Sequence, residues 1–136
     1  GRGEAPAFET SAPHVELGDA PAALRAAGAD AASSWRDEAS LDRVITMPWG
    51  MEYSGRALLG IYLVEITTHS WDLAAATGNE HLLDESLGSS ALACAEATIR
   101  PDYRNEAGDP FGPEVTAPEG ATTWDRLGAF MGRVPR

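Results

Sequence analysis

The sequence predicts an all-α domain, and three observations lead to this fold class. Hydrophobic residues make up 43% of the 136 residues, enough for one small domain to bury a core. Ala-rich apolar stretches, bounded by Gly, Pro and Asp, fill most of the chain and are typical of helices and their ends. Only residues 43–53 form a short β-branched segment with a turn. We therefore expect a single helical domain over residues 1–136.

The first expected helix covers residues 20–38. Asp19 is placed to cap it, and Pro21 suits its first turn. Four apolar residues recur at helical spacing and predict the stripe that this helix buries. They are Leu24, Ala27, Ala31 and Trp35. The β-branched run that follows, with its Pro48-Trp49-Gly50 turn, predicts an extended or hairpin segment around residues 43–53.

Three more helices are expected after this segment. The helix at 54–77 is the longest and most apolar, and Gly78 ends it. The helix at 84–99 has Asp84 as its cap. The last helix, at 122–131, begins with a Thr and an Asp at the spacing of a capping box.

The charge and the cysteine content exclude several classes of function. The formal net charge is −11, from ten Arg, no Lys and 21 acidic residues. Nucleic acids and anionic membranes are therefore not expected as partners, because both bind basic surfaces. No apolar run reaches the roughly 18 residues of a membrane span. With Cys94 as the single cysteine there is no internal disulfide framework, which fits a cytoplasmic protein.

An acid and an imidazole interrupt the apolar helix expected at 54–77. Glu65 and His69 are four residues apart, so they project from one face, and Asp72 falls on the same side. Unpaired buried charges are costly, so these groups need partners. Three interpretations remain open: a core histidine bonded to a carboxylate, a divalent metal held by the Glu oxygen and the His nitrogen, or an acid/base pair without metal.

The neighbouring polar residues also have more than one interpretation. Asp72 either accepts a hydrogen bond from an imidazole N–H and orients the ring, or pairs with an Arg or caps a loop. Thr68 lines the site or bonds a backbone carbonyl. Cys94 is interpreted as a small core residue rather than a nucleophile. Arg100 is expected to pair with Asp102 on the surface.

The segment around these residues resembles the signature of a known family. It reads Glu65-x-x-x-His69-x-Trp71-Asp72-Leu73-Ala74-x-Ala76-Thr77-Gly78. This string is similar to the signature of the mycothiol-dependent maleylpyruvate isomerase-like proteins, metal-binding members of the DinB superfamily. Weaker matches elsewhere agree in order, including the ending Gly132-Arg133-Val134-Pro135. The resemblance covers nearly the whole chain.

The resemblance implies a DinB-like four-helix bundle with a divalent metal near one end of its core. It assigns Glu65 and His69 as metal ligands, with Zn expected first and Ni or Fe as alternatives. The family's third ligand, a His on its second helix, has no counterpart here, since neither His14 nor His81 matches it. We therefore expect this chain to be the C-terminal portion, without the first two helices and with its third ligand outside the chain.

The expected function is that of a divalent-metal-binding protein of the mycothiol-dependent isomerase or thiol-transferase type. Such a metal favours the nucleophilic thiolate of a small-molecule thiol, for which the resemblance suggests mycothiol, and the thiolate attacks a small electrophile. The sequence does not decide between catalysis and metal binding alone. The alternatives are a non-enzymatic helical binding module with a buried Glu/His/Asp network, and an inactive gene fragment. Apolar helix faces left without cover allow a homo-oligomer.

Overall fold

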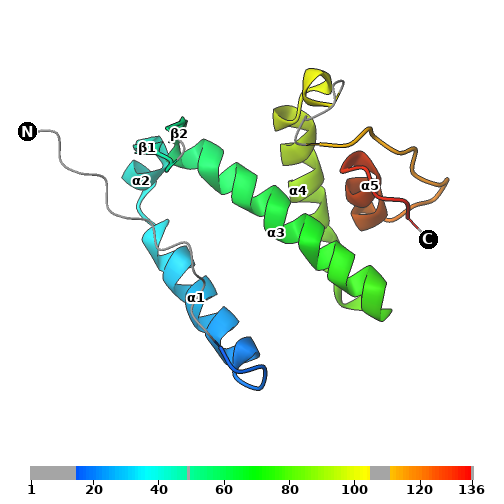
Figure 1. Ribbon diagram of the computed structural model, residues 1–136, viewed down its shortest axis with the longest axis horizontal. Helices are drawn as coiled ribbons and strands as arrows, with labels where there is room; N and C mark the ends of the chain where they lie inside the picture. The colour runs from blue at the N-terminus through cyan, green and yellow to red at the C-terminus, as the bar shows by residue number, and fades with distance from the viewer. Residues whose placement is uncertain (1–14, 49, 105–110, 136) are drawn as a thin grey trace, which may run out of the picture. The chain divides into compact units, whose positions relative to one another are not determined.

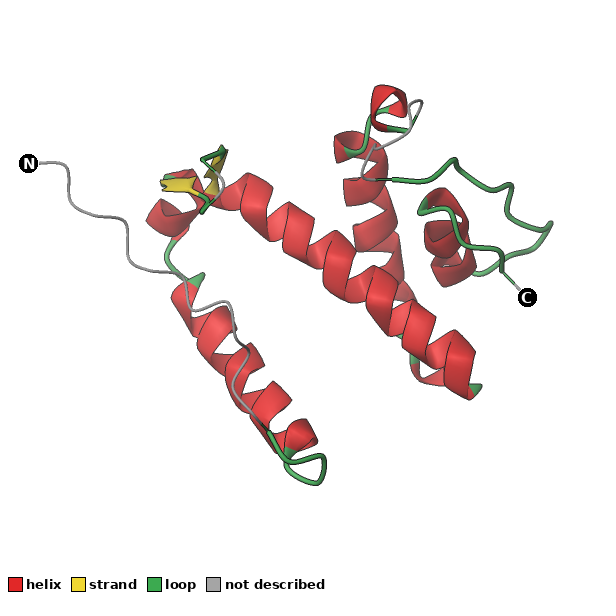
Figure 2. Ribbon diagram, in the orientation of Figure 1, coloured by secondary structure: helices red, strands yellow, loops and turns green. Residues whose placement is uncertain are grey.

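The computed structural model describes residues 15–48, 50–104 and 111–135, and it is mostly helical (Figures 1 and 2). One small two-stranded sheet interrupts the helices. The expected helical fold class is therefore confirmed at this level. The chain divides into two compact units, residues 1–56 and 57–136, and each is described by itself below.

The first unit contains two helices and a hairpin. These elements are α1 (Ala20–Ser34), α2 (Glu38–Asp42), β1 (Val44–Thr46) and β2 (Glu52–Ser54). The two strands are antiparallel, with Ile45 opposite Tyr53. The turn between them is closed by the Met47 N–H, which donates to the Met51 carbonyl at 2.8 Å. The sequence prediction of a hairpin at residues 43–53 is thus confirmed.

The helix expected at 20–38 is shorter than predicted. α1 ends at Ser34, and α2 starts separately because the Asp37 carboxylate accepts a hydrogen bond from the Ala39 N–H and caps it. The predicted side-chain cap at Asp19 is wrong, since only its backbone carbonyl bonds the helix. The predicted buried stripe is also wrong: α1 has no buried residue, and Leu24 is 76% exposed. Periodicity gives a helix an apolar face, but burial needs a packing partner.

The second unit is built from three helices and two short 3₁₀ turns. Its helices are α3 (Gly55–Thr77, whose first two residues belong to the first unit), α4 (Glu85–Thr98) and α5 (Thr123–Phe130); the 3₁₀ turns are η1 (Glu80–Leu82) and η2 (Pro101–Tyr103). Each helix end lies within one residue of the predicted position. Gly78, at φ +70°, follows the end of α3 as the sequence suggests.

The hydrophobic core of this unit lies where α3, α4 and α5 meet. Its buried members are Val64, Ala91, Leu92, Ala95, Ile99, Leu127 and Met131. Leu127, Ala91 and Ala95 are completely buried. The small alanines of α4 leave room for the larger side chains of the two other helices, so the core fixes one face of α3 and turns the opposite face outward.

Two tryptophans attach α5 to its neighbours. Trp71 of α3 packs against Gly128, and its indole N–H donates to Asp125 at 3.1 Å. Trp124 of α5 packs against Gly88 of α4, and its indole N–H donates to a backbone carbonyl at the start of α4. A Cβ at either glycine would lie about 3 Å from an indole ring. α5 can therefore approach α3 and α4 this closely only because these positions are glycine.

The predicted caps of α4 and α5 are confirmed. Thr122 accepts a hydrogen bond from the Asp125 N–H at 3.1 Å. Asp84 accepts hydrogen bonds from the Ser86 N–H at 2.8 Å, the Ser86 hydroxyl at 2.6 Å and the Leu87 N–H at 3.3 Å. These bonds lower the pKa of the Asp84 carboxyl below its ordinary value.

This cap makes stability depend on pH. Because the folded pKa of Asp84 lies below its unfolded pKa, its contribution is complete above the unfolded value and disappears as the pH falls through the folded one. We expect the free-energy advantage of the wild-type chain over Asp84→Asn to shrink as the pH falls from about 5 to about 2, measured by urea unfolding. An advantage that stays constant over this range would contradict the prediction.

Within the described residues, no helix is both long enough and apolar enough to cross a membrane.

Candidate functional site

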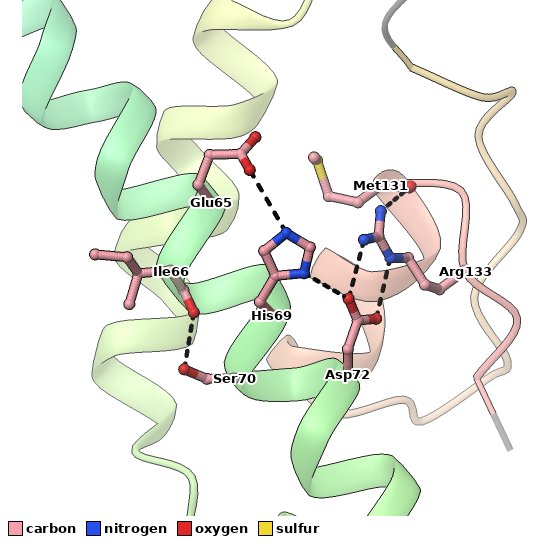
Figure 3. A network of polar contacts seen from close by, with 7 residues as sticks. All are labelled: Glu65, Ile66, His69, Ser70, Asp72, Met131 and Arg133. Carbon is pink, nitrogen blue, oxygen red and sulfur yellow. Dashed lines mark hydrogen bonds and ion pairs between the residues drawn. The ribbon is translucent and has the colours of Figure 1, made fainter. Parts of the chain in front are cut away.

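Three polar side chains of α3 meet at the candidate site, beside the segment that follows α5 (Figure 3). The His69 ring lies between two carboxylates of its own helix. Its Nδ1 atom is 3.0 Å from Oδ2 of Asp72, and its Nε2 atom is 3.6 Å from Oε2 of Glu65. The side chain of His69 is 66% exposed and that of Glu65 is 49% exposed, so ligands can reach both from solvent.

Asp72 makes both of the contacts that were considered for it, one to the imidazole and one to an Arg. One of its oxygens faces the His69 ring, as described above, and both oxygens accept hydrogen bonds from Arg133. The Arg133 Nε atom donates to Oδ1 at 3.1 Å, and Nη2 donates to Oδ2 at 3.0 Å. Asp72 therefore connects the candidate site on α3 with the segment that follows α5.

The charge of Asp72 determines the hydrogen-bonding role of the ring. The Arg133 hydrogen bonds lower the pKa of Asp72; partial burial opposes this effect, and the His69 hydrogen bond adds to it. The carboxylate is therefore ionised at neutral pH and can only accept hydrogen bonds. Nδ1 of His69 therefore donates to this carboxylate, and the tautomer that carries its proton on Nδ1 has its lone pair on Nε2, the nitrogen that faces Glu65.

The distance between Nε2 of His69 and Oε2 of Glu65 fits a metal ion bound by both atoms. A separation of 3.6 Å is too long for a hydrogen bond between Nε2 and the Glu65 carboxylate. Two tetrahedral ligands with bonds of about 2.0–2.2 Å lie about 3.4 Å apart, which is close to the observed value. A carboxylate that accepts the other ring N–H is also the arrangement in which proteins orient metal-binding histidines. Glu65 and His69 thus fit two positions around a divalent ion.

No third protein ligand lies at this point in the described part of the chain. Within residues 15–48, 50–104 and 111–135, no group of three or more His, Cys, Asp or Glu is arranged to hold a metal. A helical rise of about 12 Å separates His69 from the last residue of α3, and His81 follows only after the turn at Gly78, in η1. His14 falls outside the described residues.

α3 also carries exposed apolar side chains. Tyr62 is 45% exposed, Ile66 is 66% exposed and Leu73 is 67% exposed. The helix therefore combines one metal-type ligand pair with apolar side chains that solvent reaches.

The other candidate residues have structural roles. Cys94 is half-buried against the core, with its Sγ atom 3.6 Å from the Gly60 carbonyl, as expected for a packing residue. Arg100 pairs with Asp102 through two hydrogen bonds, which confirms the surface pairing. The predicted hydrogen bond of Thr68 to a backbone carbonyl is wrong, because its hydroxyl is buried and has no partner among the described residues.

Arg133 is the site residue that sequence reasoning missed. It lies 61 positions after Asp72, far beyond the three- and four-residue spacings that identify neighbours on one helix. The available signal was weak: an Arg directly after Gly132, in a segment that the family resemblance includes without assigning it a role.

Comparisons with known proteins give relatives without an assigned function. The chain is similar to two uncharacterized proteins of Mycobacterium tuberculosis, from strains CDC 1551 and H37Rv. Each is 36% identical to it over 115 residues, which is 85% of this chain and 62% of the relative. The chain thus spans less than two thirds of the length of these relatives. No protein-family model and no solved structure matches it.

Proposed function

We propose that this protein binds a divalent metal ion through Glu65 and His69, with Zn(II) as the first ion to test and Ni(II) or Fe(II) as alternatives. One observation supports this most strongly: Asp72 holds the His69 ring so that Nε2 lies 3.6 Å from the Glu65 carboxylate. Imidazole nitrogen together with carboxylate oxygen is a donor set that Zn(II) accepts. Asp72 orients the ring, and Arg133 holds Asp72.

The proposed chemistry follows from the family resemblance. We propose a partial DinB-like four-helix bundle of the mycothiol-dependent isomerase or thiol-transferase type, in which the first two helices and the third metal ligand lie outside this chain. A bound metal of this kind supplies Lewis acidity that favours a thiolate over a thiol. Cys94 packs against the core, so the thiol would come from a small molecule such as mycothiol. The substrate would be a small electrophile.

The exposure of the pair supports a ligand site. Exposed ion pairs contribute little to stability, and about two thirds of the His69 side chain and half of the Glu65 side chain are exposed, so both groups are accessible to a ligand. The exposed apolar residues of α3, Tyr62, Ile66 and Leu73, would give an apolar substrate or a covering helix a contact surface. The non-enzymatic alternative remains an outcome of the test below.

The test is a Zn(II) titration of the untagged full chain, followed by the ¹⁵N NMR signals of the His69 ring. We expect one-to-one binding that shifts the Nε2 signal of His69, with a Kd weaker than about 1 µM because only two protein ligands are present. An unchanged His69 signal at about 1 mM Zn(II) would overturn the metal site and favour the polar network. Binding tighter than about 1 µM would instead overturn the placement of the third ligand outside this chain.

A further inference from the structure

The segment after α5 has a geometry that fixes Arg133 independently of the candidate site. Gly132 adopts φ +83°, and its N–H donates to the Ala129 carbonyl at 3.0 Å. The N–H of Arg133 donates to the Gly128 carbonyl at 2.9 Å. This pair of bonds is the Schellman motif, which ends a helix with a glycine in the left-handed conformation. The backbone of Arg133 is therefore held by the end of α5 itself.

Hydrogen bonds to Met131 and to Asp72 then orient the guanidinium group of Arg133. Its Nη1 atom donates to the Met131 carbonyl at 2.8 Å, while Nε and Nη2 form the two hydrogen bonds to Asp72 (Figure 3). Two parallel bonds between a guanidinium and a carboxylate fix direction as well as distance. About one third of each side chain in this ion pair is exposed. The carboxylate of Asp72 consequently has one orientation in which all three of its contacts are made.

This orientation is passed on to the imidazole. Asp72 and His69 are three residues apart on α3, so their side chains are neighbours on one side of the helix. The 3.0 Å contact turns Nδ1 of the ring toward Asp72. Without a fixed Asp72, an exposed histidine exchanges rotamers and tautomers freely. The chain of contacts Met131–Arg133–Asp72–His69 thus determines which ring nitrogen faces Glu65.

We propose that Arg133 is a positioning residue for His69: acting through Asp72, it holds the ring in the rotamer and the Nδ1–H tautomer that present Nε2 beside Glu65. In this way the segment after α5 sets the metal affinity of a site whose ligands both lie on α3. The link to affinity rests on the proposed metal site. The orientation of the ring stands on the hydrogen bonds alone.

The test compares Arg133→Met and Arg133→Lys in the full chain. Met keeps the aliphatic stem but removes every donor, whereas Lys keeps the charge and loses the two-bond geometry. Arg100→Met is the matched control, because Arg100 makes the same type of two-bond pair with Asp102 away from the site. Circular dichroism and thermal unfolding establish that each variant is folded.

Two readouts separate positioning from a structural role. In the metal-free chain, the ¹⁵N shifts of the His69 ring report its tautomer; we expect the Nδ1–H form in wild type and in Arg100→Met, and a mixture in Arg133→Met. In the Zn(II) titration, we expect Arg133→Met to weaken binding about 10- to 100-fold, the usual cost of losing a group that orients a ligand, with a smaller loss for Arg133→Lys.

The outcomes also distinguish this inference from the proposed function. An unchanged tautomer and unchanged Zn(II) affinity in Arg133→Met would overturn the positioning role while leaving the metal site standing. If wild type fails to bind Zn(II) at His69 yet its tautomer shifts in Arg133→Met, the proposed function fails and the positioning role holds. If Arg133→Met does not fold, Arg133→Lys carries the test on both readouts, because it keeps the positive charge and loses the two-bond geometry to Asp72.

Discussion

Replacing His69 with alanine is expected to weaken Zn(II) binding by the full chain by more than about 100-fold. Loss of a group that merely orients a ligand costs about 10- to 100-fold, and His69 is proposed as the ligand itself. Once the ring is gone, one carboxylate cannot hold the ion against water. Isothermal titration calorimetry of the untagged chain measures both the effect and the stoichiometry.

The control for this substitution is His81→Ala. His81 is an exposed imidazole in η1 and has no place in the candidate site, so removing it tests for adventitious binding. Glu65→Gln is the complementary variant, since it keeps the shape of the side chain and removes its charge. Equal affinity in wild type and His69→Ala, or an equal loss in His81→Ala, would show that the bound zinc does not occupy the proposed site.

Replacing Leu127 with alanine is expected to destabilise the chain by about 2–5 kcal/mol, the largest effect on folding predicted from this structure. The side chain of Leu127 is completely buried in the core formed by α3, α4 and α5. Its loss removes buried apolar area and leaves a cavity, because the surrounding helices close it only in part. Urea unfolding followed by circular dichroism gives the change in the free energy of unfolding.

Leu73→Ala provides the matched control, because the same atoms are removed from a side chain that is 67% exposed. Substitutions at exposed positions usually change stability by no more than about 0.5 kcal/mol. A loss at Leu73 as large as the loss at Leu127 would mean that the outward face of α3 is covered in solution. The core assignment would fail if both substitutions were neutral.

The helices of the second unit could be predicted from the sequence because local groups determine their ends. Asp84 and Thr122 accept hydrogen bonds from the first turns of α4 and α5, and Gly78 takes the left-handed conformation after α3. Each of these signals acts within about four residues. The break between α1 and α2 also has a local cause, the cap at Asp37, which was overlooked because the Ala-rich pattern extends past it.

Only those residues of the candidate site that belong to one helix, α3, could be predicted from the sequence. Helical spacing brings Glu65, His69 and Asp72 to one side of α3, and the structure agrees. Spacing says nothing about Arg133, whose contact depends on how α5 packs against α3. The same limit explains the error at α1, where Leu24 has a helical pattern but no burial. Tertiary contacts between distant segments are the part that one sequence does not reveal.

The ion pair between Asp72 and Arg133 also ties the site to the core of the second unit. Arg133 follows α5, and Leu127 of α5 is completely buried in that core, so we expect α5 to detach only when the core opens. When the core opens, Arg133 leaves Asp72 and the His69 ring loses its support. The oriented form of the pair would then exist only in the folded unit. A ligand that binds only this form would thus raise the free energy of unfolding.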